Sequence, residues 1–457
     1  MPYQTVNPFN NKLIKTYPDH SDQQVQQALD RAHRLYKSEW SQGPVQSRVQ
    51  VLHKLSALIA ARVDDLAKIA SEEMGKLIEQ SRGEVKLCAA IASYYAEHAE
   101  TFLQPTRYPT DLGEAWVENS PIGVLVAVEP WNFPYYQLMR VLAPNLAAGN
   151  PILVKHASIV PHCAEVFEQL VHEAGAPEGA YTNLFISTDQ VGTLIDDDRV
   201  QGVALTGSEK AGSIVAARAA SKLKKSTLEL GGNDIFAVLD DCDLEKAIKA
   251  AAQARLSNCG QVCTAAKRFI VHEKVADAFL KGFTAQMQAV KPGDPLDPQT
   301  TLGPLSSAQA LKDLAKQVDE AVKAGATLHL GGKKVENTDG NFYQPTILTG
   351  ITRDNPAYFQ EFFGPVAQVY VVKDDEELVT LANDSHYGLG GAIFTQDTAR
   401  GKALASRIET GMVYINSATD TAPELPFGGV KRSGYGRELS DLGIKEFVNQ
   451  KLVVIAK

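Results

Sequence analysis

The sequence is poor in cysteine, in long hydrophobic runs and in surplus positive charge. It has only five cysteines among 457 residues, too few and odd in number for a disulfide scaffold. We therefore expect a reducing compartment, the cytoplasm. Apolar runs such as 124–128 are far shorter than the roughly 20 residues of a transmembrane helix, so we expect no membrane segment. The first 15 residues are polar and contain Pro2 and Pro8, unlike a secretion signal.

Acidic residues outnumber basic ones, with 54 Asp and Glu against 45 Lys and Arg and a net charge of −9. Neither sign forms a long run, so we expect no nucleic-acid partner. Small anionic ligands are still compatible with this balance, because helix N-termini and single arginines bind them locally. The composition, 44% hydrophobic and 22% charged, is typical of a folded globular protein, and the length favours two or three domains.

Hydrophobic spacing indicates a helical beginning followed by two stretches of alternating strands and helices. Ser21 is a candidate N-cap, after which apolar residues recur with a helical period. Short strand-like runs follow at 123–128, 151–154, 183–186 and 201–205. They begin again at 235–239, 268–271 and 366–372, with a helix expected over 311–324. This alternation predicts βαβ units and parallel sheets, whose ligands bind at the carboxyl ends of the strands.

Two cysteines four residues apart, Cys259 and Cys263, are the first candidates for chemistry. A thiolate attacks carbonyl carbon readily and leaves easily from a thioester. Either cysteine could serve as such a nucleophile, although the spacing alone favours a buried packing role. We expect no metal site, because no histidine or further cysteine lies nearby in the sequence to complete a ligand shell.

Two polar side chains at predicted strand ends have alternative interpretations. Glu229 precedes the pair Gly231-Gly232 and could activate water as a general base, but alone it is more typical of a solvated or ion-paired glutamate. Asn132 lies between two prolines and could donate to an oxyanion. By itself that run is more typical of an aromatic-proline turn.

A third pattern, Thr206-Gly207-Ser208, follows a predicted strand and begins a predicted helix. This geometry presents free backbone N–H groups to a phosphate, and it is equally common without a ligand. Neither the G-x-G-x-x-G fingerprint nor the phosphate-binding loop G-x-x-x-x-G-K-[ST] occurs here.

Taken together, seven motifs in order along nearly the whole chain resemble the aldehyde dehydrogenase family. The motifs are Pro130-Trp-Asn-Phe-Pro134, Leu153-Val-Lys-His-Ala-Ser158, Thr206-Gly-Ser208, Leu228-Glu-Leu-Gly-Gly232, Gly260-Gln-Val-Cys263, Glu361-Phe-Phe-Gly-Pro-Val366 and Pro426-Phe-Gly-Gly429. The resemblance implies an α/β fold with two Rossmann-type parallel-sheet domains and a small β oligomerisation arm. It implies a dinucleotide-binding domain at 1–105 and 121–229, a catalytic domain at 230–425, and an arm and tail at 106–120 and 426–457. A homodimer or homotetramer follows from this architecture.

The resemblance also implies a role for each candidate. Cys263 would be the nucleophile, Asn132 and the Cys263 backbone N–H the oxyanion hole, and Glu229 the general base, whereas Cys259 would be a bystander. Hydride would pass to a nicotinamide, and water would hydrolyse the thioester. The implied cofactor-binding residues are Trp131, Asn132, Lys155, His156, Ala157, Ser158, Gly207, Ser208, Leu230, Glu361 and Phe363.

The expected cofactor and substrate depend on individual residues at positions that vary within the family. Ser158 stands where many NAD-using relatives have a glutamate, which removes a charge that would repel a 2′-phosphate, so we expect NADP to be tolerated or preferred over NAD. The resemblance is closest to short bacterial succinate-semialdehyde dehydrogenases. Arg140 would grip the substrate carboxylate, with Tyr136 and Phe427 beside the substrate. A second arginine of some relatives is Ser257 here.

Other functions are compatible with the same residues. The substrate could be another small-molecule aldehyde, either aliphatic or ω-carboxylated like glutarate semialdehyde. Acyl transfer to coenzyme A is disfavoured because Glu229 supplies the base that hydrolysis needs. A nucleotide-binding protein without catalysis is the alternative of another class, and the presence of Cys263, Glu229 and Asn132 argues against it.

Overall fold

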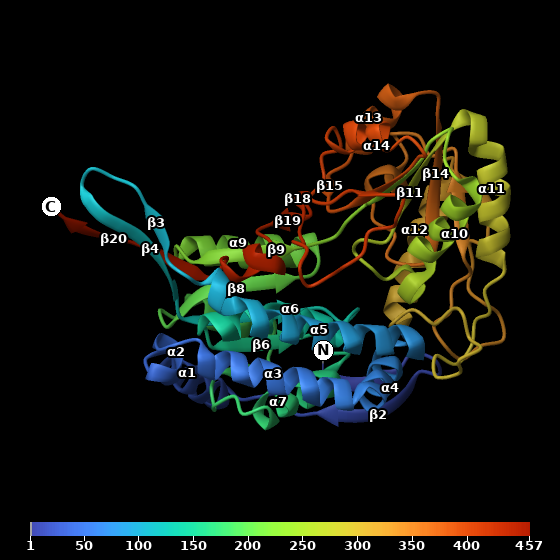
Figure 1. Cartoon of the computed structure of the whole chain (residues 1–457). Helices are drawn as coiled ribbons and strands as arrows, with labels where there is room; N and C mark the ends of the chain where they lie inside the picture. Colours follow the sequence, from blue (N-terminus) through green and yellow to red (C-terminus); the bar gives the residue numbers. More distant parts are fainter. Residues whose placement is uncertain (1) are drawn as a thin grey trace.

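The computed structural model describes residues 2–457, and Met1, the first residue of the predicted first domain, lies outside them. Figure 1 shows two bodies, each built on its own sheet, and a thin arm that projects away from them and carries the C-terminus. The sheets have six, seven and three strands, besides two two-stranded pairs. The expected α/β fold with two parallel-sheet units and a β arm is confirmed.

The first sheet has the strand order β19-β9-β8-β5-β6-β7. Its parallel strands are β5 (Val124–Glu129), β6 (Ile152–His156), β7 (Tyr181–Asn183), β8 (Val200–Thr206) and β9 (Lys225–Glu229), and β19 (Gly434–Tyr435) adds an antiparallel edge. The connecting helices are α6 (Pro134–Ala148), α7 (Pro161–Glu173), α8 (Thr188–Asp196) and α9 (Glu209–Ser221). Most residues of β5 and β6 are buried, which is why these two strands read as nearly continuous apolar runs.

The helical beginning is also confirmed. Ser21 caps α1 (Asp22–Tyr36) by accepting a 3.3 Å hydrogen bond from Gln24 N. The helices α2 (Glu39–Gln42), α3 (Gln46–Ala61), α4 (Val63–Met74) and α5 (Ile78–Phe102) follow. A hairpin of β1 (Tyr3–Asn7) and β2 (Lys12–Tyr17) precedes them and was not predicted.

The strand predicted at 183–186 is wrong beyond its first residue, because β7 spans Tyr181–Asn183. Leu184 and Ile186 are buried in the cluster that includes Leu29 of α1. Their apolar character therefore reflects core packing after the strand has ended, which hydrophobic periodicity alone cannot distinguish from a strand.

The second sheet has the strand order β12-β13-β14-β11-β10-β16-β17. The strands are β10 (Ile235–Val238), β11 (Arg268–His272), β12 (Thr327–Leu330), β13 (Thr346–Thr349), β14 (Val366–Val372), β16 (Gly391–Phe394) and β17 (Tyr414–Ile415). Only the β12–β13 pair is antiparallel. The helices are α10 (Leu244–Leu256), α11 (Glu273–Gln288), α12 (Ala308–Lys323), α13 (Asp375–Asn383) and α14 (Thr398–Ala405).

The arm joins two segments that are far apart in the sequence. Its strands are β3 (Thr106–Tyr108), β4 (Gly113–Pro121) and β20 (Val448–Ala456), with Val448 opposite Pro121 and Ala456 opposite Gly113. The rest of the segment 426–457 lies elsewhere: β18 (Val430–Lys431) pairs with β15 (Tyr387–Gly388), and α15 (Ser440–Ile444) lies beside α6. The division into domains stays a prediction.

Within residues 2–457, no helix combines the length and the apolar character that crossing a membrane requires.

Candidate active site

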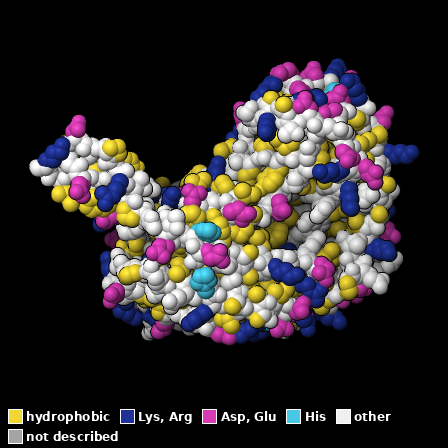
Figure 2. Space-filling view, viewed as in Figure 1, with side chains coloured by type: hydrophobic (Ala, Val, Ile, Leu, Met, Phe, Trp, Pro, Cys, Tyr) yellow, Lys and Arg dark blue, Asp and Glu magenta, His cyan; other side chains and the backbone are white. Residues whose placement is uncertain are grey.

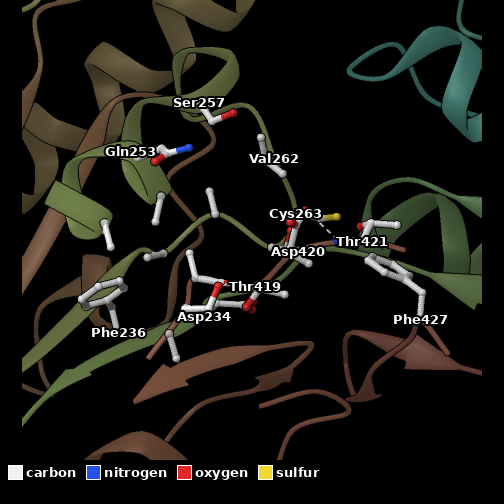
Figure 3. Close-up of a pocket in the computed structure, with 18 of the residues that line it drawn as sticks. Asp234, Phe236, Gln253, Ser257, Val262, Cys263, Thr419, Asp420, Thr421 and Phe427 are labelled. Carbon is white, nitrogen blue, oxygen red and sulfur yellow. Dashed lines mark hydrogen bonds between the residues drawn. The ribbon is translucent and has the colours of Figure 1, made fainter. Parts of the chain in front are cut away.

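A cavity of about 460 Å³ is lined by residues of both bodies. Phe133, Tyr136 and Gln137 line it from the start of α6, and Cys263 and Phe427 line it from the second body and the C-terminal segment. Figure 2 shows the molecule hollowed between its two bodies, with hydrophobic side chains on the walls. In Figure 3 the sulfur of Cys263 points toward Thr421 and Phe427. The predicted nucleophile is therefore half-buried and faces a cavity.

The chain reaches Cys263 through a tight left-handed turn. Asn258, Cys259 and Gly260 have φ angles of 49°, 54° and 75°, which L side chains adopt rarely. A Cβ atom at Gly260 would lie 2.2 Å from the carbonyl oxygen of Gly364, so only glycine allows this approach. Cys259 is buried in the cluster that includes Leu302, as its packing interpretation predicts.

Asn132 is hydrogen-bonded directly to residues 258–263, which we call the nucleophile loop. Its Nδ2 donates to the carbonyl oxygen of Gln261 at 3.1 Å, and its own carbonyl oxygen accepts from Asn258 Nδ2 at 2.9 Å. The side chain of Gln261 in turn donates to Asn258 O at 3.0 Å. A primary amide has two N–H donors, so Asn132 keeps one for a developing oxyanion. Asn258 and Gln261 were not predicted as site residues, although both stand inside the cysteine motif.

A buried ion pair supports the start of α6, just after Asn132. Glu84 Oε1 accepts from the backbone N–H groups of Tyr135 and Tyr136 at 2.8 and 3.1 Å, satisfying donors that a helix N-terminus leaves free. Lys76 pairs with Glu84, and its Nζ lies 3.6 Å from the ring centroid of Phe133. The support that Glu84 gives to α6 was not predicted, because the backbone donors lie 51 and 52 residues away from it.

Glu229 ends β9 and is only 3% exposed. Among the described residues, neither of its carboxylate oxygens has a hydrogen-bond partner. Burial, reinforced by Glu438, raises its pKa well above the ordinary value, against the opposing effect of Arg140. Glu229 is thus neither solvated nor ion-paired, and this environment favours its neutral form. Its Oε1 would contact a Cβ at Gly428 at 2.7 Å, beside the cavity residue Phe427.

The thiol of Cys263 also favours its neutral form in this state. Burial raises its pKa to about 12, while Lys267 and then Arg140 act in the opposite direction. Because the thiolate is the reactive species, these two cations matter to any chemistry at the sulfur. Lys267 was not predicted, although it stands four residues after Cys263 in the sequence.

The residues predicted for the adenosine and phosphate half lie at the carboxyl edge of the first sheet. Lys155 is the penultimate residue of strand β6, and Ala157 and Ser158 follow that strand. Gly207 follows β8, and its N–H donates to Glu229 O at 2.9 Å. Ser208 caps α9 by accepting from Ala211 N at 3.3 Å. A helix N-terminus and a half-buried lysine at the carboxyl edge of one sheet fit an anionic dinucleotide.

The residues predicted for the nicotinamide half come from both bodies. Trp131 and Phe363 meet edge to face, with ring centroids 5.7 Å apart. Glu361 accepts from Gly232 N at 3.1 Å and pairs with Lys267 at 3.0 Å. Leu230 follows Glu229 and is buried. The structure therefore gathers these residues between the end of β9 and the nucleophile loop.

His156 has a different position from the one expected of a cofactor ligand. Its imidazole is fully buried, with ring nitrogens 3.2 Å from Glu129 O and 3.0 Å from Pro134 O. Burial lowers its pKa to about 4. Its side chain therefore supports the loop that carries Trp131 and Asn132, and cannot contact a cofactor from there.

Arg140 lies behind the cavity wall, 1% exposed. It pairs with Glu438 and donates to Tyr136 Oη at 3.2 Å and Thr206 Oγ1 at 3.0 Å. Its guanidinium carbon lies 5.0 Å from the ring centroid of Tyr136 and 4.7 Å from that of Phe427. Of the predicted substrate residues, Arg140 thus contacts both Tyr136 and Phe427. Glu438, 298 positions away from Arg140, was not predicted.

Across residues 2–457, no group of three or more His, Cys, Asp or Glu side chains is arranged to hold a metal ion.

Sequence comparison identifies the family. The model of the aldehyde dehydrogenase family matches residues 1–453. The chain belongs to the aldehyde dehydrogenase family. Two curated family members carry closely related sequences. The succinate-semialdehyde dehydrogenase [NADP(+)] of Deinococcus radiodurans is 50% identical over 99% of this chain and 94% of its own length. A probable succinate-semialdehyde dehydrogenase [NADP(+)] of Synechocystis is 44% identical over 99% of both.

Solved aldehyde dehydrogenase structures share the whole fold. The succinic semialdehyde dehydrogenase of Streptococcus pyogenes, crystallised in complex with NADP+ as the cofactor, has a TM-score of 0.98, 50% identity and full coverage of both chains. The enzyme of Burkholderia pseudomallei has a TM-score of 0.96 and 34% identity, covering 100% of this chain and 95% of its own. The predicted family and fold are therefore confirmed.

Proposed function

We propose that this aldehyde dehydrogenase oxidises succinate semialdehyde to succinate with NADP as the hydride acceptor. The observation that carries the proposal is that Cys263 lines the cavity and that Asn132 is hydrogen-bonded to the loop that carries this cysteine. Glu229 lies beside Gly428, which follows the cavity residue Phe427. The chain is also 50% identical to a succinate-semialdehyde dehydrogenase over 99% of its length. NAD is the second candidate cofactor, since a neighbour at 28% identity was crystallised with NAD+.

The side chains at the cavity divide the reaction into two steps. The Cys263 thiolate attacks the aldehyde carbon, and the resulting thiohemiacetal oxyanion accepts hydrogen bonds from Asn132 Nδ2 and the Cys263 backbone N–H. A nicotinamide held by Glu361 and Phe363 would supply the hydride acceptor for that carbon, so that a thioester would remain on Cys263. Glu229 then takes a proton from water, whose oxygen attacks the thioester carbon. The C–S bond breaks, the carboxylic acid departs, and the sulfur recovers a proton.

A dinucleotide fits the carboxyl edge of the first sheet, where β6 and β8 end. We propose that Lys155 and Ser158, with the backbone of His156 and Ala157, hold the adenosine ribose and its phosphate. Gly207 and Ser208 would bind the pyrophosphate at the N-terminus of α9. Glu361, Phe363, Trp131 and Leu230 would hold the nicotinamide half. The backbone N–H of Gln4 already fixes Ser158 O at 3.1 Å, which keeps this segment in place.

Cofactor choice depends on the charge at position 158. Replacing Ser158 by glutamate places a carboxylate where a 2′-phosphate would bind, and like-charge contacts cost several kcal/mol. We expect kcat/KM with NADP to fall about 100-fold while kcat/KM with NAD changes less than about threefold. Ser158→Gln has the same shape without the charge and should affect both cofactors equally. Steady-state kinetics with both dinucleotides make the comparison, and a parent enzyme with strong NAD preference contradicts it.

The cavity wall supports a substrate with a carboxylate at its far end. Tyr136 Oη accepts from Arg140, so the phenol keeps its own O–H to donate. Arg140 adds a positive charge behind that hydroxyl, and it retains one unused N–H on each Nη atom. We propose that Tyr136 and Arg140 bind the carboxylate and that Phe427 packs against the methylene chain. Thus the aldehyde end would reach Cys263.

Arg140 should distinguish charged from uncharged aldehydes. With Arg140→Ala we expect kcat/KM for succinate semialdehyde to fall about 100-fold more than for butanal, because a hydrogen bond to a charged group contributes about 1.5–3 kcal/mol. Glu438→Gln disturbs the same buried contact but keeps the guanidinium, so it should affect both aldehydes alike. Equal losses on both substrates in the Arg140 variant would reject the carboxylate role.

The test of the function itself is an aldehyde panel assayed with both dinucleotides and with product analysis. Succinate semialdehyde should have the highest kcat/KM and yield succinate. A higher value for glutarate semialdehyde or for an uncharged aldehyde would move the proposal to that substrate. Formation of an acyl-coenzyme A would replace hydrolysis by acyl transfer, and a purified protein inactive with every aldehyde would favour a binding role.

We also propose that the arm joins copies of this chain into a homodimer or homotetramer. Large apolar side chains on it are exposed, including Leu112 at 69%, Leu452 at 61% and Ile455 at 57%, and exposed apolar patches mark interaction surfaces. Sedimentation should give a multiple of 49.5 kDa, and Leu452→Asp should release monomer. A monomeric parent protein contradicts this.

The five unpaired cysteines support a cytoplasmic location, which we propose.

A further inference from the structure

Lys267 is a fully buried lysine that the reaction described above leaves without a role. Its Nζ donates to the carbonyl oxygens of Val262, at 2.9 Å, and of Cys263, and pairs with Glu361 Oε1 at 3.0 Å. Three acceptors match the three N–H groups of an ammonium. The ammonium is thus fixed from three sides, and one of these contacts is the nucleophile's own carbonyl.

The second end of this arrangement is the carboxylate of Glu361. Besides Lys267, Glu361 Oε1 accepts from Gly232 N at 3.1 Å, and a Cβ at Gly231 would lie 2.4 Å from its Oε2. These two glycines follow β9, where Glu229 ends the strand. Lys267 therefore links three parts of the site: the nucleophile's backbone, a carboxylate proposed for the cofactor, and the strand that carries the base.

The charge of Lys267 also acts on the thiol of Cys263. Four charged groups act on the Cys263 thiol: Lys267 and Arg140 lower its pKa, and Glu361 and Asp234 raise it. Lys267 has the larger effect of the two cations. Each cation has a carboxylate partner, Glu438 for Arg140 and Glu361 for Lys267, but Lys267 also donates to the carbonyl oxygen of Cys263 itself. Because the site is buried, a fixed charge acts there with little screening.

We propose that Lys267 is a positioning residue of this dehydrogenase: its ammonium fixes the Cys263 carbonyl and the Glu361 carboxylate in one arrangement and keeps a permanent positive charge near the sulfur. It acts through Cys263 and Glu361 and needs no contact with the substrate. The inference rests on the proposed reaction, and it assigns to one side chain both the activation of the thiol and the placement of the cofactor ligand.

The test compares Lys267→Gln, which keeps a hydrogen-bond donor without the charge, with Lys267→Arg, which keeps the charge. Alkylation of Cys263 by iodoacetamide is followed at pH 9 by peptide mass spectrometry. We expect the rate to fall about tenfold in Lys267→Gln, since a thiol far below its pKa loses tenfold of its thiolate for each unit by which the pKa rises. Lys267→Arg should stay within about threefold of the parent. KM for NADP should rise about tenfold in Lys267→Gln, because Glu361 loses its anchor.

Internal controls separate this role from a general loss of folding. Cys88 and Cys163 are fully buried, and their alkylation measures opening of the fold. A variant that merely loosens the protein would expose all three thiols and speed their reaction, the opposite of the expected change at Cys263. Unchanged alkylation and KM in Lys267→Gln, or an equal loss in Lys267→Arg, would overturn the proposal. Alkylation needs no turnover, so a parent enzyme inactive with aldehydes would reject the proposed reaction separately.

Discussion

Cys263→Ser is expected to lower kcat/KM for the aldehyde by about 10⁴-fold or more, the scale seen when a nucleophile is removed from its catalytic group. A serine hydroxyl ionises far less than a thiol, and an ester is a poorer acyl donor to water than a thioester. Neither the burst of reduced cofactor nor the steady state should be detectable. Stopped-flow absorbance of the reduced nicotinamide makes the measurement.

Cys259→Ser is the matched control for this loss. It lies four positions earlier in the same loop, but its side chain packs among Leu302, Leu305 and other residues of the second body. We expect its turnover to stay within about threefold of the parent, with a stability loss of about 1–3 kcal/mol from burying a hydroxyl. Full activity of Cys263→Ser would exclude Cys263 as the nucleophile, and inactivity of Cys259→Ser in a folded protein would show that Cys259 is not a bystander.

Glu229→Gln has the second largest expected effect, and it should separate formation of the thioester from its hydrolysis. Attack by Cys263 and hydride transfer do not use the Glu229 carboxylate, so one equivalent of reduced cofactor per site should still form rapidly. Hydrolysis should slow by about 10²–10³-fold, within the range of general-base catalysis. An acylated Cys263 should accumulate and be visible by intact mass. If both steps lose the same factor, Glu229 is not the hydrolytic base.

The raised pKa of Glu229 gives this prediction a pH dependence. A base must be unprotonated, so the parent's hydrolysis should accelerate as the pH rises through the pKa of Glu229, while the rate of Glu229→Gln stays flat. Stability changes in the opposite sense. A carboxyl whose folded-state pKa lies above its unfolded value of 4.5 stabilises the fold most below that value, and the contribution is lost as the pH rises through the folded pKa. At pH 9 the Gln variant should therefore melt above the parent.

The fold was largely predictable because its local signals agree with one another. The strand predicted at 123–128 is β5 with one residue's shift, and that at 366–372 is β14 without any. Most residues of both strands are buried, so their sequences are predominantly apolar. The prediction at 183–186 is displaced because a three-residue edge strand contributes less pattern than the buried segment after it. The N-terminal hairpin escaped notice because β2 is mostly exposed and polar.

The candidate site was predictable wherever a motif carries the chemistry itself, as at Cys263 and Asn132. What the sequence could not supply are partners joined only by folding. The contact of Arg140 with Glu438 brings a helix of the first body to the C-terminal segment, and no local spacing encodes it. Likewise, the sequence around Glu229, two residues before a pair of glycines, resembles that of a surface glutamate. Only folding buries its carboxylate away from hydrogen-bond partners.

The pairing of β4 with β20 also constrains how the protein is made. The ladder begins between Pro121 and Val448. The partner strand of β4 is therefore synthesised about 330 residues later, which takes on the order of 20 to 60 seconds at ribosomal rates. Throughout that interval one long edge of β4 has no native strand beside it, which invites pairing with other nascent chains. A chaperone that shields extended segments during translation should therefore raise the yield of this enzyme, and shortening the chain by its last ten residues should send it to inclusion bodies.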